Sequence, residues 1–262
     1  MTPRVAPVLG AICRRTWRKT LRRPVVLAFS FAQPLMWMIF FGFLFHRYVL
    51  QGSLQGLTYI DFLLPGICAM TVLFGASQFG IGLIRDMLTG FLSRLLTTPA
   101  DSALVLSGKL LADVLRLLAQ AAVVLVLGVL LGANVTFSLG AWLGAWLALA
   151  LFATAFCSLS ALIALKAKAP EAMAAYVQIV NMPLLFTSTA LVPTKQMPEW
   201  LATLSDGNPL TLTVNACRNA LLFGDAPSVS GSLLPLLAMS LFLFWLAVWM
   251  LRREEADLAL AM

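Results

Sequence analysis

The sequence predicts an all-α polytopic membrane protein with six transmembrane helices, an N-terminal amphipathic interfacial helix and an outer re-entrant helical hairpin between spans five and six. Of its 262 residues, 61% are hydrophobic and 11% are charged, whereas soluble domains carry about 25% charged residues. A membrane-spanning helix needs about 20 mostly apolar residues. Six stretches meet this requirement: 25–45, 60–84, 108–132, 138–165, 172–192 and 233–251. We treat residues 1–262 as one transmembrane domain.

Lys and Arg are distributed unevenly along the chain, and this predicts the orientation of the helices. Seven of the 18 basic residues precede the first span, four lie around the connection between spans two and three, two lie at 166–168 and two at 252–253. Only three fall on the other side, namely Arg47, Lys195 and Arg218. Because basic residues near the ends of spans are retained in the cytoplasm, both termini are expected there. The asymmetry accounts for the net charge of +7 without a nucleic-acid ligand.

The first 24 residues form a basic arm before span one. Residues 6–23 place apolar side chains on one helical face and arginines on the other, which is typical of a helix that lies in the membrane interface. An anchoring role is favoured over a lipid-sensing one. The first apolar run is too long for a removable signal sequence and is interpreted as span one. The cysteines form no C-x-x-C pair, so neither a disulfide framework nor a metal site is expected.

Two predicted spans carry polar side chains at helical spacing. The stripe on span two consists of Thr71, Gly75, Gln78 and Gly82. The polar sector of span five, which Pro183 interrupts, consists of Gln178, Asn181 and Ser188. In lipid, such a face either packs closely against another helix or lines a polar cavity. Packing is favoured for span two, because glycine dominates its stripe.

Span three begins with three charged residues whose spacing allows them to pair along one helix. They are Lys109, Asp113 and Arg116. A local ion-paired ladder is favoured over an intramembrane charged site. The reason is that these residues lie near the cytoplasmic end of the span, where long basic side chains reach the interface.

The connection RDMLTGFLSRLLTTP, residues 85–99, is expected to form a short helix on the cytoplasmic surface. Asp86, Gly90 and Arg94 would stay accessible, and Pro99 would end the helix. Such a helix is either a docking site for a soluble partner or a simple interfacial turn, and the stretch alone favours neither.

The connection 193–224 contains an apolar stretch, 210–223, that is too short to cross the bilayer and too apolar to leave it. A helical hairpin that dips into the outer leaflet meets both constraints.

No catalytic machinery is evident in the sequence. His46 is the only histidine, so no histidine-based triad or multi-histidine metal site can form. No G-x-x-x-x-G-K-[ST] loop occurs. No acidic residue falls near the centre of a predicted span, which disfavours a proton-coupled carrier. The chain is therefore not expected to be an enzyme, and no catalytic, cofactor-binding or metal-binding residues are predicted.

Three segments, taken in order, resemble the permease subunits of ABC exporters of the drug and polysaccharide efflux class, which includes daunorubicin-resistance and nodulation-factor permeases. The segments are YIDFLLPGICAM, RDMLTGFLSRLLTTP with the following LSGKLLADVLR, and FTSTALVPTKQMPEW with the following GNPLTLTVNACRNALLFG. The similarity runs over nearly the whole chain.

This resemblance implies a multi-pass permease of a bacterial cytoplasmic (inner) membrane that works as a dimer, expected to be a homodimer, with two copies of a separate ABC ATPase. ATP and magnesium would bind the ATPase, and this chain would hold no cofactor. The exported substrate would be amphipathic: a drug, a lipid or a lipid-linked saccharide. The alternative is a non-transporting membrane anchor or sensor that recruits a cytoplasmic partner.

The resemblance also implies roles for particular residues. Coupling to the ATPase would involve Arg85, Asp86, Gly90, Phe91, Arg94, Leu95 and Pro99. A substrate path between spans two and five would be lined by Thr71, Gln78, Gln178, Asn181 and Ser188. An outer gate would be formed by Pro193, Asn208, Pro209 and Arg218.

Overall fold

The computed structural model describes residues 10, 14, 24–45, 56–90, 102–167 and 169–260, and this part of the chain contains helices and no strand. The long helices are α2 (Pro24–Leu44), α3 (Tyr59–Leu88), α5 (Ser102–Leu130), α6 (Leu139–Ala167), α7 (Pro170–Phe186) and α10 (Ala226–Leu260). Between α7 and α10 lie the short elements η2 (Thr194–Gln196), α8 (Glu199–Asp206), α9 (Pro209–Arg218) and η3 (Asn219–Phe223). The predicted all-helical class is confirmed here. The predicted N-terminal helix lies outside the described residues, apart from Gly10 and Arg14.

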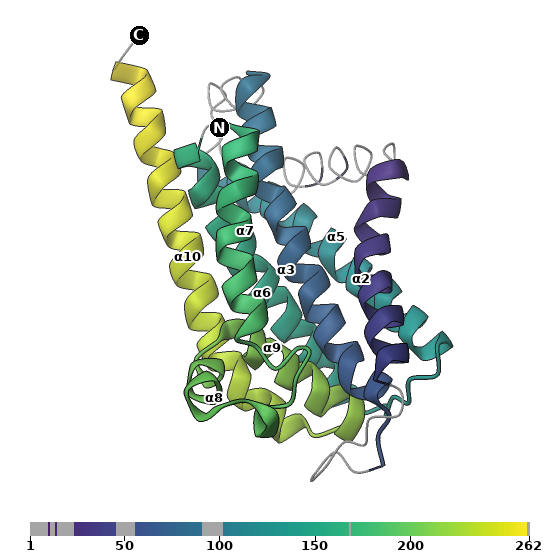
Figure 1. Cartoon of the computed structure of the whole chain (residues 1–262). Coiled ribbons are helices and arrows are strands. Elements are labelled where there is room, and N and C mark those ends of the chain that lie inside the picture. The colour runs from purple at the N-terminus through teal and green to yellow at the C-terminus, as the bar shows by residue number, and fades with distance from the viewer. Residues whose placement is uncertain are drawn as a thin grey trace.

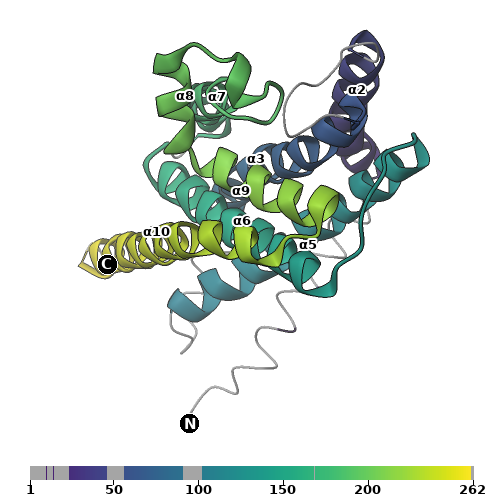
Figure 2. The same cartoon turned by 90° about the horizontal axis from the view of Figure 1, so that it is seen from below.

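The long helices run alternately in opposite directions (Figure 1). α2 begins and α10 ends at one end of the bundle, which we call the terminal end, and the short elements between α7 and α10 gather at the other, which we call the far end (Figure 1). α3 lies centrally and packs against α2, α5, α6, α7 and α9. Figure 2 shows α9 crossing the far end of the bundle over α3 and α6.

Among the described residues, four helical stretches are long and apolar enough to cross a membrane: Tyr59–Leu88, Ala103–Leu130, Leu139–Ala167 and Ala226–Arg253. They match four of the predicted spans. In the part of α2 whose side chains are described, the apolar helix is shorter and covers Phe31–Leu44. α7 has 17 residues, about 25 Å at 1.5 Å per residue, which is less than the hydrocarbon thickness of about 30 Å. The six-span arrangement therefore stays a prediction.

The predicted fifth span, 172–192, is wrong at its carboxyl end, because the helix stops at Phe186. At this helix end the Pro183 carbonyl accepts from the Thr187 N–H at 3.0 Å and from the Thr187 hydroxyl at 2.8 Å. Residues 188–190 then turn inward and are buried. Polar residues that a spanning helix would carry into lipid are instead placed inside the protein.

Two glycines allow close approach of neighbouring segments to α3. A Cβ atom at Gly66 would overlap the backbone of Ala190, in the turn after α7. A Cβ atom at Gly80 would overlap Ser160 of α6 and Met173 of α7. Small residues at contact faces let backbones approach closely. The core is therefore held by backbone proximity as well as by side-chain packing.

The segment predicted as an outer hairpin, 193–224, forms the short elements at the far end. α9 and η3 follow one another through 209–223, which matches the predicted short apolar stretch. α9 packs against α3, α6 and α10. A re-entrant path through the outer leaflet stays a prediction.

Candidate functional site

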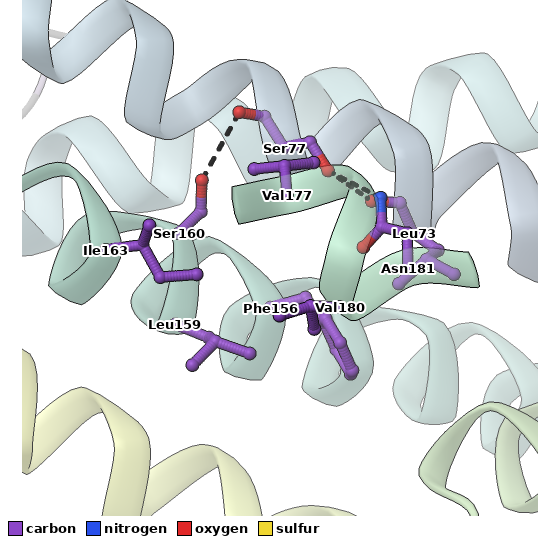
Figure 3. A pocket seen from close by; sticks show the side chains of 9 residues that line it. All are labelled: Leu73, Ser77, Phe156, Leu159, Ser160, Ile163, Val177, Val180 and Asn181. Atoms are coloured by element: carbon purple, nitrogen blue, oxygen red, sulfur yellow. Dashed lines mark hydrogen bonds between the residues drawn. The ribbon is translucent and has the colours of Figure 1, made fainter. Parts of the chain in front are cut away.

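Three long helices meet at a polar contact formed by Ser77 of α3, Ser160 of α6 and Asn181 of α7, which we call the central seam. Asn181 Nδ2 donates to Ser77 Oγ at 2.9 Å. Ser160 Oγ donates to the Ser77 carbonyl at 3.3 Å and accepts from the Gly80 N–H at 3.0 Å. All three side chains are buried, and Figure 3 shows how they converge. The seam thus links α3, α6 and α7 in the interior.

A small pocket borders the central seam. Its apolar lining comes from the same three helices: Leu73, Phe156, Leu159, Ile163, Val177 and Val180 (Figure 3). The pocket has room for about one water molecule. An amphipathic molecule cannot pass through it, so the structure is closed at this level.

The structure separates the five residues predicted to line a path. Asn181 lies in the central seam. Thr71 and Ser188 are buried, but their hydroxyls donate to carbonyls three or four residues earlier in the chain. Gln78 and Gln178 are exposed. The predicted residues therefore do not form one continuous lining within a single chain.

Ser77 and Ser160 complete the seam, yet they belong to neither predicted stripe. The available signal was the spacing of Ser77 and Gly80, which are three residues apart and so share a face of α3 next to that of Gln78. Spacing marks both faces as small and polar, and only packing distinguishes the buried face from the exposed one. Within the predicted stripe, Gly75 does pack closely, against α5.

At the far end, Asn208 ties α9 to the end of α7. Its side-chain oxygen accepts from the Leu210 N–H at 2.8 Å and caps α9. Its Nδ2 donates to the Leu184 carbonyl at 2.7 Å and to Thr187 Oγ1 at 2.9 Å. Pro209 is the first residue of α9, where a missing N–H costs no helical hydrogen bond. Asn208 therefore combines a capping role with a tether between two helices.

Arg218 lies buried at the other end of α9. Its Nη2 donates to the Thr189 carbonyl at 2.9 Å and to the Phe62 carbonyl at 3.4 Å, and its Nη1 donates to Asn215 Oδ1 at 3.2 Å. The guanidinium also stacks on the Phe62 ring, 3.9 Å from the centroid. Its Nε has no hydrogen-bond partner among the described residues. Arg218 thus joins α3, α9 and the turn after α7.

Burial lowers the pKa of the Arg218 guanidinium to about 9, while Cys217 and Tyr59 act in the opposite direction. The group still carries its charge at neutral pH. A buried charge is costly unless it is well hydrogen-bonded, so few other side chains can replace Arg218 at this position.

Three of the four predicted gate residues lie on α9 or at its start, and the fourth, Pro193, precedes η2.

At the terminal end, the predicted coupling helix does not begin at Arg85. Residues up to Leu88 form the last turn of α3, Thr89 follows as its cap, and Gly90 has a φ of 64°, a left-handed conformation common just after helices. Arg85 is exposed. The other predicted coupling residues lie outside the described part of the chain: Phe91, Arg94, Leu95 and Pro99.

The prediction that Asp86 is accessible is wrong. Its side chain is buried, and Oδ2 lies 2.7 Å from Nζ of Lys109 on α5. The predicted ladder along span three is therefore wrong at Lys109, which pairs with Asp86 of α3. It is confirmed for Asp113 and Arg116, where Nε of Arg116 lies 2.8 Å from Oδ1 of Asp113. A buried carboxylate needs hydrogen-bond donors or a cation nearby, and spacing within one helix cannot show that the cation bound to Asp86 comes from another helix.

Comparison with known proteins decides the family. A family model described as ABC-2 type transporter matches residues 7–222, which include the central seam and all of α9. The chain belongs to the ABC-2 type transporter family. This confirms the resemblance to ABC permeases that the sequence motifs indicate.

This ABC-2 chain is 33% identical over 212 residues to the putative transport permease ycf38 of Cyanophora paradoxa, a match that covers 80% of the chain and 72% of the relative. It is 30% identical over 227 residues to the daunorubicin resistance ABC transporter permease protein DrrB1 of Streptomyces coeruleorubidus, with coverage of 86% and 79%. The chain is therefore a multi-pass transmembrane subunit of a transporter. ABC-2 permeases generally work with an ABC ATPase partner.

Proposed function

We propose that the chain is the permease of an ATP-driven ABC exporter in a bacterial inner membrane. Two copies form a homodimer with both termini in the cytoplasm, and two copies of a separate ATPase bind at the terminal end. The substrate is an amphipathic drug, lipid or lipid-linked saccharide that leaves the cytoplasm or the inner leaflet. ATP and magnesium bind in the ATPase. Family membership and the similarity to a daunorubicin resistance permease support this proposal.

The observation that carries the proposal is a pair of exposed amides. Gln78 of α3 and Gln178 of α7 each lie within one helical turn of the Ser77–Asn181 hydrogen bond, but both are exposed. Hydrocarbon cannot satisfy the hydrogen bonds of an amide. The exposed faces of α3 and α7 therefore need a polar partner, and two copies that face each other across a hydrated path provide one.

Opening such a path requires α7 to move relative to α3, because the central seam is closed. The Asn181–Ser77 hydrogen bond is the side-chain bond that joins the two helices there. Interhelical hydrogen bonds in membranes contribute about 0.6 kcal/mol on average. ATP-driven movement can break such a contact, and the cluster around α9 then acts as the outer gate.

Purification of the tagged chain from its host in mild detergent tests the proposal. We expect an ABC ATPase to co-purify in an amount equal to the chain, and we expect it to be lost from a Gly90→Trp, Arg94→Glu variant. In reconstituted vesicles, daunorubicin serves as the probe drug, and its ATP-dependent accumulation is measured. Gln78→Ala and Asn181→Ala are expected to lower that accumulation, and unchanged accumulation in both would remove the basis for the path.

The same measurement identifies the alternative function. A complex that binds the ATPase, but moves neither daunorubicin nor a fluorescent phospholipid and shows no ATPase response to them, would be a membrane anchor or sensor. An anchor has no reason to respond to a transported molecule.

A further inference from the structure

α3 and α5 form an antiparallel hairpin whose contacts extend along both helices (Figure 1). Toward the far end, Gly128 of α5 packs against the side chain of Leu64. Midway, Gly75 of α3 packs against Leu117, and Arg116 Nη2 donates to the Gly75 carbonyl at 3.3 Å. Glycine at these contacts lets the two backbones approach closely.

A buried aspartate closes this hairpin at each end. At the far end, Asp61 accepts from the Asn134 N–H, just beyond α5, at 2.7 Å and from the Thr58 N–H at 2.8 Å. At the terminal end, Asp86 pairs with Lys109 at 2.7 Å. The two aspartates are 1% and 5% exposed, so water does not compete effectively for either carboxylate.

The surroundings of the Asp86–Lys109 pair make it a rigid link. Only 6% of the Asp86 side chain and 15% of the Lys109 side chain are exposed, and Lys109 Nζ lies 5.5 Å from the centroid of the Phe79 ring. Removal of one partner would deprive the other of this ion pair in the interior, which is unfavourable. The pair therefore joins the end of α3 to the start of α5. A force on the segment between the two helices would act on both of these ends together.

α7 contacts the same core through fewer buried residues than α5 does. Its buried residues are Met173, Asn181 and Leu185, which form one stripe at helical spacing. Its exposed residues include Gln178 and Ile179. Separation of α7 from α3 breaks the Asn181–Ser77 bond and the contact of Met173 with Gly80, while the turn after α7 stays attached to α3 through Arg218. Separation of α5 from α3 breaks close packing along both helices and two carboxylate links.

We infer that α3 and α5 move as one rigid hairpin during transport, that Asp86 and Lys109 are positioning residues that lock its terminal end, and that opening occurs at the contact between α3 and α7. The inference rests on the proposed function, because ATP-driven movement requires a bound ATPase. Asp86 acts on the neighbouring helix of its own chain, in place of the ATPase contact that the family resemblance implied for it.

Distances between spin labels test the rigid hairpin in the intact complex. The background replaces all four cysteines by alanine: Cys13, Cys68, Cys157 and Cys217. Labels at Leu88 and Leu111 report on α3 and α5, and labels at Leu88 and Tyr176 report on α3 and α7; all three positions are exposed. Double electron–electron resonance compares nucleotide-free complexes with complexes trapped by ATP and vanadate. The labelled chain is diluted with unlabelled chain so that dimers carry one labelled copy.

We expect the Leu88–Leu111 distance distribution to be the same in both states and the Leu88–Tyr176 distribution to shift on trapping. An α3–α5 shift as large as the α3–α7 shift, or no shift in either pair, overturns the inference although the ATPase is bound. Absence of the ATPase from the wild-type complex overturns the proposed function and the inference with it. The two failures are therefore distinguishable.

Charge substitutions test the role of the ion pair. Asp86→Asn and Lys109→Gln keep the approximate size of each side chain, and each should lower the daunorubicin transported per ATP hydrolysed by about tenfold, as expected for residues in one ion pair. In both variants, trapping should also shift the Leu88–Leu111 distance. The exchanged variant Asp86→Lys, Lys109→Asp should recover both properties.

Asp206→Asn is the control, because it makes the same substitution at an exposed aspartate of α8, outside the α3–α5 hairpin. It should keep the wild-type transport ratio. Single variants that match wild type in ratio and distance, or an exchanged variant that recovers nothing, overturn the inference. If a single variant fails to accumulate in the membrane, accumulation of the exchanged variant supports the pair and its failure to accumulate contradicts it.

Discussion

Arg218 is held by carbonyl oxygens, an amide oxygen and an aromatic ring. These partners belong to α3, α9 and the turn after α7, so one side chain fixes the relative position of three segments. The planar guanidinium suits this task, because its donors form a rigid fork and its face can stack. A lysine at this position would keep the charge but lose both features.

We predict that Arg218→Lys lowers the free energy of unfolding in detergent by about 1.5–3 kcal/mol, the range typical of hydrogen bonds that involve a charged group. Thermal unfolding followed with a thiol-reactive dye measures the change, because Cys68, Cys157 and Cys217 are buried in the folded chain. Arg85→Lys is the control, since Arg85 is exposed. Equal melting temperatures for Arg218→Lys and wild type would contradict the role of the fork.

Gly66 of α3 lies directly against the backbone of the turn after α7. Gly66→Ala should strongly reduce the amount of folded protein, because the added methyl group would overlap the Ala190 backbone, which cannot rotate away. Gly82→Ala, on the same helix, meets open space and should be neutral or stabilising by up to about 1 kcal/mol, the helix-propensity difference. Size-exclusion profiles and melting temperatures compare the two. Similar behaviour of both variants would show that the close approach is unimportant.

Sequence spacing was reliable for pairs within one helix and unreliable between helices. The pairing of Asp113 with Arg116 follows from their separation of three residues. The partner of Lys109 does not, because Asp86 reaches it from another helix. Likewise, helical periodicity identified a polar face on α3 but not that Ser77 faces α7 while Gln78 is exposed. The missing information is which neighbour covers each face.

Among the elements, long apolar runs were predicted well because lipid requires each spanning helix to satisfy its own backbone. Hydropathy alone therefore located the four stretches that are long enough to cross a membrane in the described part of the chain. It failed at the end of α7, where residues 187–190 are polar or small. There the helix ends, Asn208 donates to the Thr187 hydroxyl oxygen, and Arg218 donates to the Thr189 carbonyl. Such tertiary partners have no signature in a local window of sequence.

The link between α7 and α9 can be separated into its two components at Asn208. Asn208→Ser retains a neutral side-chain oxygen that can cap α9 but loses the amide that donates to Leu184 and Thr187. Asn208→Ala loses both. We predict that the alanine variant is less stable than the serine variant by about 1 kcal/mol, the usual contribution of an N-cap, and that both fall below wild type. Thermal melting in detergent measures both differences.

A different ranking locates the stabilisation in one component. A serine variant as stable as wild type would show that the tether to α7 contributes nothing. A serine variant no more stable than the alanine variant would show that the cap contributes nothing.

At the scale of the whole molecule, the exposed faces differ in chemistry. α10 exposes large apolar side chains such as Leu241, Phe242 and Trp245, which suit contact with lipid tails. α3 and α7 expose the amides of Gln78 and Gln178. An amide has little to gain from hydrocarbon, so the α3–α7 face is the one that a second copy of the chain should cover.

Cysteine cross-linking between copies tests this assignment of faces. In a chain whose native cysteines are replaced by alanine, we predict that Gln178→Cys gives a covalent dimer in native membranes with a short bismaleimide. Leu241→Cys, at a position that is also exposed but lies on α10, should stay largely monomeric, because lipid separates that face from its neighbours. The fraction of dimer on a denaturing gel is the measurement. A Leu241→Cys dimer at least as abundant as the Gln178→Cys dimer would place α10, and not α7, at the contact between copies. The exposed amides would then need another polar partner.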